Sequence, residues 1–338
     1  MSRPVLGITM GDAAGIGPEI ILKAFQGDRL FSLCSPLIIG SLPTMEFYKS
    51  LLGVDISFRP INHVSQASAE SGTLDILDLG LIDTDALKIG KTDPAPGKAA
   101  VIFTQKAAQL AAAGRIDAVV SAPLNKEAMR LAGYSYEGQT QIFAEITGSK
   151  RYGMILLLGS IRAMMLTTHL PLREACDAVT KENILEKIEL AHESLVAFGI
   201  ERPKIAVAGL NPHAGEGGLF GREEVDETIP AIEAALMRGI DVVGPMPADV
   251  VFLKARDGEF DLTLAMYHDQ ANMVAKFLGF GKVVTLLAGM PIIRTSVGHG
   301  TAFDIAGKGV ADEANFIKAI EVAAELAVTR KRSGDEHP

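Results

Sequence analysis

Four of the seven histidines in the 338-residue chain follow apolar, strand-like segments at points where the chain turns. Their contexts are TTH for His169, NPHAGE for His213, YHDQ for His268 and GHG for His299. Ligand-binding groups of open α/β sheets gather at the carboxyl ends of strands, where three histidines from three strands could meet one divalent metal ion. For each histidine taken singly, a structural hydrogen-bonding role is the simpler interpretation.

Two glycine-rich segments accompany these histidines. Residues 11–19, GDAAGIGPE, follow the first apolar run and lead into a helix, with Pro18 suited to its first turn. Such a turn either holds an anion at the helix N-terminus or lets strand and helix pack closely. Its spacing is neither that of a Rossmann fingerprint nor that of a P-loop. Residues 298–309, GHGTAFDIAGKG, are too small and polar for a core segment and predict an exposed binding loop.

Charged residues beside these turns supply the other candidate groups. Lys276 follows His268 at helical distance, and Arg294 follows a long apolar run. The two side chains are either solvated surface charges or a clamp for a phosphate or carboxylate group. Asp249 and Asp269 are candidate bases, groups beside a metal, or helix caps.

The elements that must position these groups alternate along the chain. Helical periodicity occurs at residues 182–198, and Pro230 predicts that another helix begins near Thr228. Strands that alternate with crossovers of a dozen or more residues predict an α/β fold with parallel sheets covered by helices. Apolar strand-like runs lie at residues 5–9, 36–39, 116–121, 154–158, 163–167, 205–208, 262–267 and 283–287.

Three local features modify this pattern. Runs 154–158 and 163–167 are too close in sequence for a helical crossover, so we expect an antiparallel hairpin there and a mixed sheet. Residues 92–97, TDPAPG, are expected to form a loop. Residues from Lys331 onward are expected to form a frayed polar tail.

Composition excludes several classes of protein. The chain has 32 Lys and Arg against 41 Asp and Glu, a net charge of −9, and therefore lacks the basic footprint of general nucleic-acid or anionic-membrane binding. Its two distant cysteines fit a reducing compartment. The sequence shows no signal-peptide pattern and no apolar run of the roughly 20 residues that span a bilayer. We therefore expect a cytoplasmic protein with two domains and no nucleic-acid or membrane partner.

Long motifs in one order along nearly the whole chain resemble the 4-hydroxythreonine-4-phosphate dehydrogenase family of vitamin B6 (pyridoxine) biosynthesis, the PdxA family. The resemblance implies the isocitrate/isopropylmalate dehydrogenase-like fold, with two α/β/α lobes of mixed, mostly parallel sheets and a cleft between them. The lobes would interleave as one catalytic unit, approximately residues 1–130 plus 300–338 and residues 131–299. The motifs are ITMGDAAGIGPEI at 8–20, SAPLNKEA at 121–128, TTHLPLRE at 167–174, AGLNPHAGEGGLFGREE at 208–224, AMYHDQ at 265–270 and IRTSVGHGTAFDIAGKG at 293–309.

The resemblance also implies roles for single residues. His169, His213 and His268 match metal ligands drawn from both subunits of a homodimer with a shared active site. Zinc suits three imidazoles best, with magnesium, manganese and cobalt as alternatives. Lys276 and Arg294 match substrate-binding positions. The loop at 298–309 looks like the segment that holds the adenine side of NAD or NADP in isopropylmalate dehydrogenases, which implies as cofactor-binding residues His299, Gly300, Thr301, Asp304 and Gly307.

Two positions depart from the family pattern. The usual Gly-His-Thr-Glu motif is here Gly138-Gln139-Thr140-Gln141. Gln139 and Thr140 match substrate-binding positions, and Gln139 puts a neutral amide where the family has an imidazole. Thr285 occupies a substrate-binding position that is usually Asn. Both changes concern the substrate, so the chemistry is expected to be retained while the substrate stays open.

The implied chemistry is oxidation of a secondary alcohol by NAD or NADP. A divalent metal would lower the pKa of the alcohol, and Asp249 or Asp269 would accept its proton. The expected substrates are 4-phosphorylated hydroxy acids: 4-hydroxythreonine 4-phosphate, 4-phosphoerythronate or 4-phosphothreonate. Decarboxylation would follow where a carboxylate lies β to the new ketone. An aromatic cis-dihydrodiol carboxylate of the terephthalate type is the alternative substrate, and a non-catalytic ligand-binding protein on the same scaffold is the remaining alternative.

Overall fold

The protein divides into two compact units, each with its own strands and helices. A computed structural model describes residues 3–279 and 281–335. Unit 1 comprises Met1–Lys150 together with Met290–Pro338, and unit 2 comprises Arg151–Gly289. Each unit contains strands and helices in alternation, which confirms the predicted α/β class.

The sheet of unit 1 is parallel throughout. Its strands follow one another in the order β3-β4-β2-β1-β5-β12. The central strands β1 and β5 are almost entirely buried, as the apolar runs predicted. Because all strands point the same way, their carboxyl ends share one edge of the sheet. The strands are β1 (Val5–Thr9), β2 (Ser35–Gly40), β3 (Ser57–Pro60), β4 (Thr73–Asp78), β5 (Ala118–Ser121) and β12 (Arg294–Val297).

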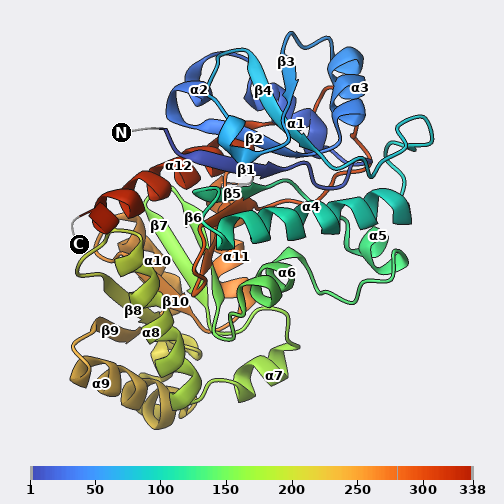
Figure 1. The fold of residues 1–338 in the computed structure, drawn as a ribbon. Coiled ribbons are helices and arrows are strands. Elements are labelled where there is room, and N and C mark those ends of the chain that lie inside the picture. The colour runs from blue at the N-terminus through green and yellow to red at the C-terminus, as the bar shows by residue number, and fades with distance from the viewer. Residues whose placement is uncertain (1–2, 280, 336–338) are drawn as a thin grey trace. The chain divides into compact units, whose positions relative to one another are not determined.

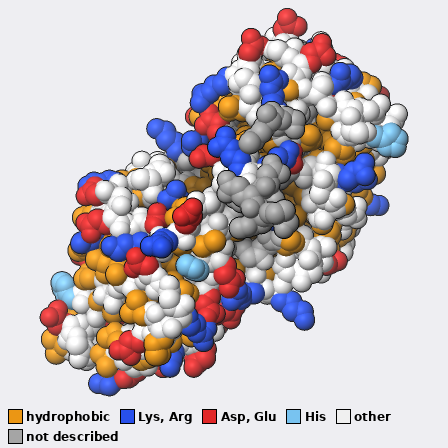
Figure 2. Space-filling model, turned by 60° about the vertical axis from the view of Figure 1, so that its left-hand side comes forward, with side chains coloured by type: hydrophobic (Ala, Val, Ile, Leu, Met, Phe, Trp, Pro, Cys, Tyr) orange, Lys and Arg blue, Asp and Glu red, His pale blue; other side chains and the backbone are white. Residues whose placement is uncertain are grey.

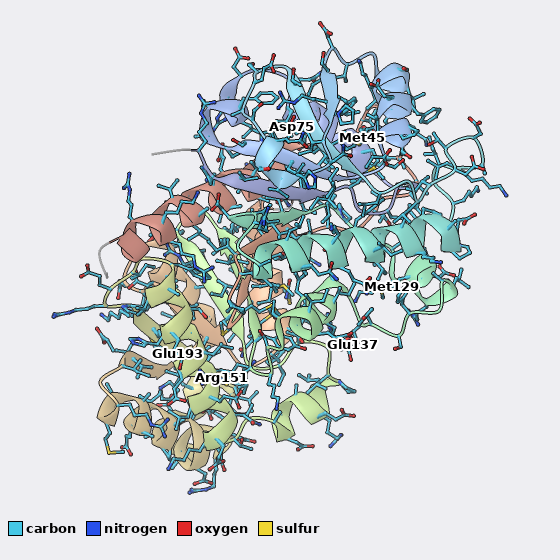
Figure 3. All side chains as sticks on the ribbon, viewed as in Figure 1. Met45, Asp75, Met129, Glu137, Arg151 and Glu193 are labelled. Carbon is cyan, nitrogen blue, oxygen red and sulfur yellow. The ribbon has the colours of Figure 1, made fainter. Side chains whose placement is uncertain are left out.

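Helices cover this sheet (Figure 1). The long helix α4 packs on β1, β2 and β5, and α12 packs on β1, β5 and β12. Helices α5 and α6 pack on α4 in turn, where Met129 (Figure 3) joins Val101 and Ile142 in a small apolar core. The helices are α1 (Gly17–Ala24), α2 (Arg29–Leu33), α3 (Leu42–Leu52), the 3-10 turn η1 (Val64–Gln66), α4 (Pro94–Ala112), α5 (Lys126–Leu131), α6 (Gln139–Thr147) and α12 (Ala314–Asp335).

These contacts set the unit boundaries, which differ from the expected ones near residues 130 and 300. Because α5 and α6 pack on α4, unit 1 continues to Lys150. Because β12 pairs with β5, unit 1 resumes at Met290.

The start of α4 corrects the expectation of a loop at residues 92–97. The Asp93 carboxylate accepts a hydrogen bond of 2.8 Å from the Ala95 amide, and Pro94 occupies the first helical position. Proline is well suited to that position because its missing N–H would have no partner there.

The end of α12 corrects the expectation of a polar tail. The helix continues to Asp335, and the Lys331 ammonium lies 2.8 Å from the Asp117 carboxylate. Residues 336–338, the last part of the expected tail, lie outside the described residues.

The sheet of unit 2 is mixed, as predicted. Its strands follow the order β11-β6-β7-β10-β8-β9. The pairs β11–β6 and β6–β7 are antiparallel, which confirms the expected hairpin, whereas β7, β10, β8 and β9 are parallel. The strands are β6 (Gly153–Leu158), β7 (Ile161–Met165), β8 (Lys204–Ala208), β9 (Asp241–Met246), β10 (Leu262–Ala265) and β11 (Val284–Ala288).

Helices again surround the strands of unit 2. Helix α9 begins directly after Thr228, as Pro230 predicted. On α8, Glu193 forms an ion pair with Arg151 at the start of the unit (Figure 3). The elements are α7 (Leu172–Asp177), α8 (Lys181–Ala197), the 3-10 segment η2 (Pro212–Gly218), the π-helical turn η3 (Glu224–Thr228), α9 (Ile229–Met237), α10 (Ala248–Arg256) and α11 (His268–Gly279).

The surface matches the acidic but mixed charge of the sequence. Acidic and basic side chains are interspersed over the face shown in Figure 2. Among the described helices, none combines the length and the apolar character needed to cross a membrane.

Candidate active site

Four candidate groups of unit 2 follow the carboxyl ends of four neighbouring parallel strands. Along the order β7-β10-β8-β9, these groups are His169, His268, His213 and Asp249. Parallel strands place their carboxyl ends at one edge of a sheet. The fold therefore brings to one edge residues that are separated by up to a hundred positions in sequence.

Side-chain hydrogen bonds tie these strand ends together. The Thr167 hydroxyl donates to the Met266 carbonyl at 3.0 Å. The Gln270 amide accepts from the Met266 N–H at 2.8 Å and donates to the Gly209 carbonyl at 3.0 Å, and the Gly209 N–H donates to Met246 at 2.7 Å. The turns after β7, β10, β8 and β9 thus form one hydrogen-bonded series. Sequence reasoning missed Gln270, although it stands two residues after His268.

His169 and His268 are candidate metal ligands that lie near each other. Their ring centroids are 6.1 Å apart. Nδ1 of His268 lies 2.7 Å from the Asp269 carboxylate, which leaves Nε2 of the ring for a ligand. Asp269 therefore orients His268. In the described part of this single chain, no group of three or more His, Cys, Asp or Glu residues is arranged to hold a metal, so His213 does not complete a set with this pair.

The turn that carries His213 has an unusual backbone. Residues 213–217 all have φ between +45° and +78°, a left-handed turn that includes the non-glycine residues His213, Ala214 and Glu216. Left-handed conformations cost non-glycine residues about 1–2 kcal/mol each. The buried Glu224 offsets this cost, because its carboxylate accepts from the backbone and side-chain N–H groups of Asn211 at 2.7 and 2.9 Å. Sequence reasoning missed Glu224, for which the only signal was a paired GREE motif.

The remaining candidates of unit 2 differ in exposure. Asp249 is exposed in the first turn of α10, and Lys276 is exposed on α11. Thr285 is buried on β11. The solvent side of α11 is strongly apolar, with Met273 69% exposed and Phe277 91% exposed.

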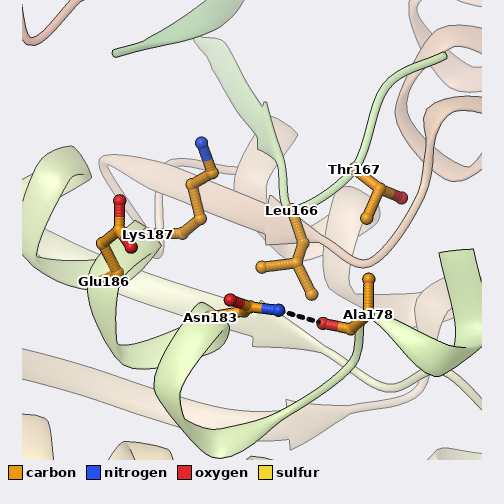
Figure 4. A pocket seen from close by; sticks show the side chains of 6 residues that line it. All are labelled: Leu166, Thr167, Ala178, Asn183, Glu186 and Lys187. Atoms are coloured by element: carbon orange, nitrogen blue, oxygen red, sulfur yellow. Dashed lines mark hydrogen bonds between the residues drawn. The ribbon is translucent and has the colours of Figure 1, made fainter. Parts of the chain in front are cut away.

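A cavity of about 270 Å³ lies beside β7 in the same unit (Figure 4). The Lys187 ammonium donates to the Tyr152 carbonyl at 3.3 Å, and burial lowers the pKa of Lys187. None of the predicted site residues lines this cavity. Its lining consists of Leu166, Thr167, Ala178, Asn183, Glu186 and Lys187.

Unit 1 contributes a buried cation, Arg294 at the start of β12. The residue is 5% exposed, and its guanidinium lies 5.4 Å from the centre of the Phe143 ring. Its Nε donates to the Ser121 hydroxyl at 3.0 Å, and its Nη2 donates to the Gln139 side-chain oxygen at 2.5 Å. Burial lowers the pKa of Arg294 to about 9, and no carboxylate among the described residues offsets this effect. Arg294 is therefore a buried charge without a counterion in the described protein.

Gln139 and Thr140 open helix α6 directly beside this cation. Gln139 is buried and donates from its Nε2 to the Ala122 carbonyl at 2.9 Å. Thr140 is half-buried in the first turn. The first amides of a helix attract anions, so the predicted substrate residues of unit 1 surround a position suited to negative charge.

The glycine-rich turn after β1 packs closely and does not form an open anion cradle. The Asp12 amide donates to the Pro123 carbonyl, and the Ile16 amide donates to the Thr301 carbonyl at 3.0 Å. The Gly15 and Ala14 amides donate to the carbonyl and the carboxylate of Asp12, respectively. These amides are therefore already satisfied. Of the two interpretations left open by the sequence, close packing is the one that the structure supports.

Asp12 is a buried carboxylate in this turn. Its second oxygen has no hydrogen-bond partner in the described protein. Burial raises the pKa of Asp12 to about 6, opposed by the hydrogen bond from the Ala14 amide and reinforced by Asp93.

The candidate cofactor loop, residues 298–309, folds onto this same turn. A side chain on Gly15 would meet Thr301, which is buried, at 2.9 Å. Nδ1 of the partly exposed His299 lies 3.0 Å from the carbonyl of Gly300. Asp304 is exposed, and Gly307 has a φ of +72°. The predicted cofactor residues thus form a continuous loop at the carboxyl end of β12.

A protein family and several known proteins are similar to this chain over most of its length. The family described as pyridoxal phosphate biosynthetic protein PdxA matches residues 32–323. The D-threonate 4-phosphate dehydrogenase of Cupriavidus necator is 45% identical over 328 residues, 97% of this chain and 98% of that protein. The 4-hydroxythreonine-4-phosphate dehydrogenase structure from Klebsiella pneumoniae has a TM-score of 0.89 and 40% identity, covering 96% of this chain and 99% of that chain.

A more distant structure bears on the alternative substrate. The terephthalate 1,2-cis-dihydrodiol dehydrogenase from Burkholderia xenovorans has a TM-score of 0.67 and 28% identity, covering 96% of this chain and 98% of that chain. Similarity is thus greater to the two phosphate-named dehydrogenases than to this one. The family match across most of the sequence and the full-length similarity at 40–45% identity establish that the chain belongs to the PdxA family.

Proposed function

We propose that the protein oxidises the secondary alcohol of a 4-phosphorylated hydroxy acid, with NAD or NADP as hydride acceptor and a divalent metal. It is an oxidoreductase of the CH–OH class, like its relatives at 40–45% identity. D-threonate 4-phosphate is the first substrate to test, because the Cupriavidus necator relative is named for it. 4-Hydroxythreonine 4-phosphate and 4-phosphoerythronate are the next.

The observation that carries this proposal is the buried charge of Arg294. Burying a guanidinium without a counterion is unfavourable unless a bound anion supplies the missing charge. A phosphate group fits, because three N–H groups of Arg294 remain without a partner among the described residues. The first turn of α6, with Thr140, offers further donors to the same anion.

The histidines of unit 2 fit a divalent metal in their chemistry. His169 and His268 would hold it, and a partner subunit would supply the third ligand, a histidine equivalent to His213, since no three-residue group is present within the described part of this chain. Imidazole ligands favour zinc over magnesium, with manganese and cobalt between them. When bound, the metal supplies a Lewis acid for the alcohol oxygen and the nicotinamide supplies a hydride acceptor.

The protein's own residues would bind and deprotonate the substrate. Asp269 orients His268, which leaves Asp249 as the candidate base for the hydroxyl proton. Lys276 and Thr285 would bind the substrate in unit 2. His299, Thr301 and their neighbours in the loop at 298–309 would bind the dinucleotide. Loss of carbon dioxide follows where the product is a 3-keto acid.

We further propose a cytoplasmic homodimer. The exposed apolar side chains of α11, Met273 and Phe277, lie on the helix that His268 begins, and a second subunit would cover them. The two cysteines, Cys34 and Cys176, are both free, as expected in a reducing compartment.

The test is a substrate panel with zinc-loaded protein, in which NADH or NADPH formation is followed by absorbance. D-threonate 4-phosphate, 4-hydroxythreonine 4-phosphate and 4-phosphoerythronate are compared with their unphosphorylated forms and with a terephthalate cis-dihydrodiol. Turnover of a phosphorylated acid and loss of turnover without phosphate support the proposal. Turnover of the dihydrodiol alone would contradict the proposed substrate class and favour the aromatic alternative. If no substrate in the panel is turned over, the remaining interpretation is a non-catalytic ligand-binding protein.

A further inference from the structure

Gln139 stands where the family pattern has a histidine, and both ends of its amide are already used within the protein. Nε2 donates to the Ala122 carbonyl at 2.9 Å, and Oε1 accepts from Arg294 at 2.5 Å. The Ala122 carbonyl can only accept, so it fixes the nitrogen toward itself and turns the oxygen toward Arg294. The amide therefore has one orientation.

This arrangement determines which way the guanidinium faces. Arg294 has five N–H donors in a planar fork, of which Nε engages Ser121 and one Nη2 hydrogen engages Gln139. The Phe143 ring lies 5.4 Å from the guanidinium carbon. Nε and Nη2 form one edge of the planar fork, so these two hydrogen bonds hold that edge and leave the Nη1 end without a partner among the described residues.

The neutral acceptor also preserves the charge of Arg294. A glutamate at position 139 would pair with the guanidinium and cancel its charge, whereas an amide oxygen accepts the hydrogen bond and carries no charge. A cation kept buried in this way has its full charge available for a dianion.

We propose that Gln139 is a positioning residue for Arg294: it orients the guanidinium without neutralising it and thereby selects a phosphate-bearing substrate. This inference rests on the proposed function, since it concerns how the same site recognises phosphate. This role differs from the one expected from the sequence, in which Gln139 binds the substrate directly. The departure from the family's histidine then changes how the arginine is held and does not remove the phosphate site.

A double-mutant cycle separates positioning from direct contact. Gln139→Leu, Arg294→Met and the double variant are compared for binding of inorganic phosphate by calorimetry and for the KM of D-threonate 4-phosphate. If Gln139 acts through Arg294, Gln139→Leu alone weakens binding about ten- to hundredfold, and it has no further effect once Arg294 is replaced. Equal effects of Gln139→Leu in both backgrounds would show direct contact and overturn the inference.

A charge variant gives a second, independent readout. Gln139→Glu should lose phosphate binding more completely than Gln139→Leu, because it pairs with Arg294. Gln141→Glu is the matched control: it adds the same charge in the same turn of α6, and the Gln141 side-chain oxygen accepts from the Glu137 amide at 2.7 Å and not from Arg294. Equal losses in the two Glu variants would contradict the inference.

The outcomes also separate this inference from the proposed function. If the wild type binds phosphate but the effects of the two substitutions are additive, the positioning role of Gln139 is wrong and the proposed function is unaffected. If the wild type binds neither phosphate nor the phosphorylated substrate, both the positioning role and the proposed function are wrong. Thermal unfolding of every variant checks that the changes in binding do not arise from loss of the fold.

Discussion

The buried guanidinium of Arg294 has opposite effects on the stability of the protein and on ligand binding. Replacement of the residue with Met removes a buried charge that has no counterion among the described residues. We expect Arg294→Met to raise the free energy of unfolding by about 1–3 kcal/mol while lowering kcat/KM for the phosphorylated substrate about a hundredfold or more. Denaturant unfolding and steady-state kinetics measure the two effects. A variant that is less stable than the wild type would mean that the bonds to Ser121 and Gln139 outweigh the cost of burial.

Asp12 gives unit 1 a measurable dependence on pH. Its folded-state pKa of about 6 lies above the ordinary value of 3.8, so the native state binds a proton more tightly than the unfolded chain between these values. Stability is therefore greatest at low pH in this window and falls as pH rises from about 4 to 6. We expect Asp12→Asn to reduce this fall by about 3 kcal/mol, measured by urea unfolding at several pH values.

The exposed Asp55 supplies the control for this experiment. Asp55→Asn should leave the pH profile as it is in the wild type. If Asp12→Asn also leaves it unchanged, the carboxylate of Asp12 is not the group responsible.

At the scale of elements, the left-handed turn before η3 positions His213. A Cβ on Gly215 would lie 2.6 Å from the Glu224 carboxylate, whereas a Cβ on Gly217 in the same turn would meet nothing within 4 Å. Both glycines have left-handed φ, of +78° and +67°. We expect Gly215→Ala to cost about 2–4 kcal/mol and to weaken zinc binding about tenfold, while Gly217→Ala costs about 1 kcal/mol and leaves zinc affinity unchanged.

Unfolding curves and zinc calorimetry distinguish these two variants. The same zinc affinity in both would show that Glu224 does not hold the His213 turn in a binding geometry. It would also place the contribution of His213 to the metal in question.

The strands that sequence reasoning found and missed differ in a physical way. Uniformly apolar runs such as β1 and β5 were predicted because buried parallel strands need apolar side chains on both faces. Strands β3, β4, β9 and β12 were missed because they are short, polar or partly exposed, as SFRP, TLDILD, DVVGPM and RTSV. Pairing with a neighbour makes these segments strands, and a neighbour cannot be inferred from a local pattern.

For the whole molecule, the proposed homodimer has a direct test. Phe277→Asp places a charge on the most exposed apolar side chain of α11, next to a helix turn that also exposes Met273. We expect a dimer for the wild type and a monomer for Phe277→Asp in analytical ultracentrifugation, because burying an unpaired carboxylate at an interface is unfavourable.

Met237→Asp is the matched control, since Met237 is also highly exposed but lies on α9. It should remain dimeric. The monomeric Phe277→Asp variant should also bind zinc less tightly, because the proposed metal set is shared between subunits. A monomer with wild-type zinc affinity would contradict that sharing.

The sequence by itself determined the class of fold, the family, the antiparallel hairpin and the list of candidate residues. These follow from local patterns: apolar periodicity, turn residues and motifs that each span a few positions. The tertiary structure alone decided which of the candidates meet. The strand order β7-β10-β8-β9 aligned His169, His268, His213 and Asp249 along one edge, and packing showed that the amides of Asp12, Ala14, Gly15 and Ile16 in the glycine turn after β1 bind acceptors within the protein.

The role of Gln139 shows the same division. The sequence marked it as a departure from the family pattern and placed it in the substrate pocket. Only the fold put its amide between the Ala122 carbonyl and the guanidinium of Arg294, which stands 155 positions later in the chain. The reason is that burial and hydrogen-bond partners arise from contacts between distant segments, and these set the charge and orientation on which recognition depends.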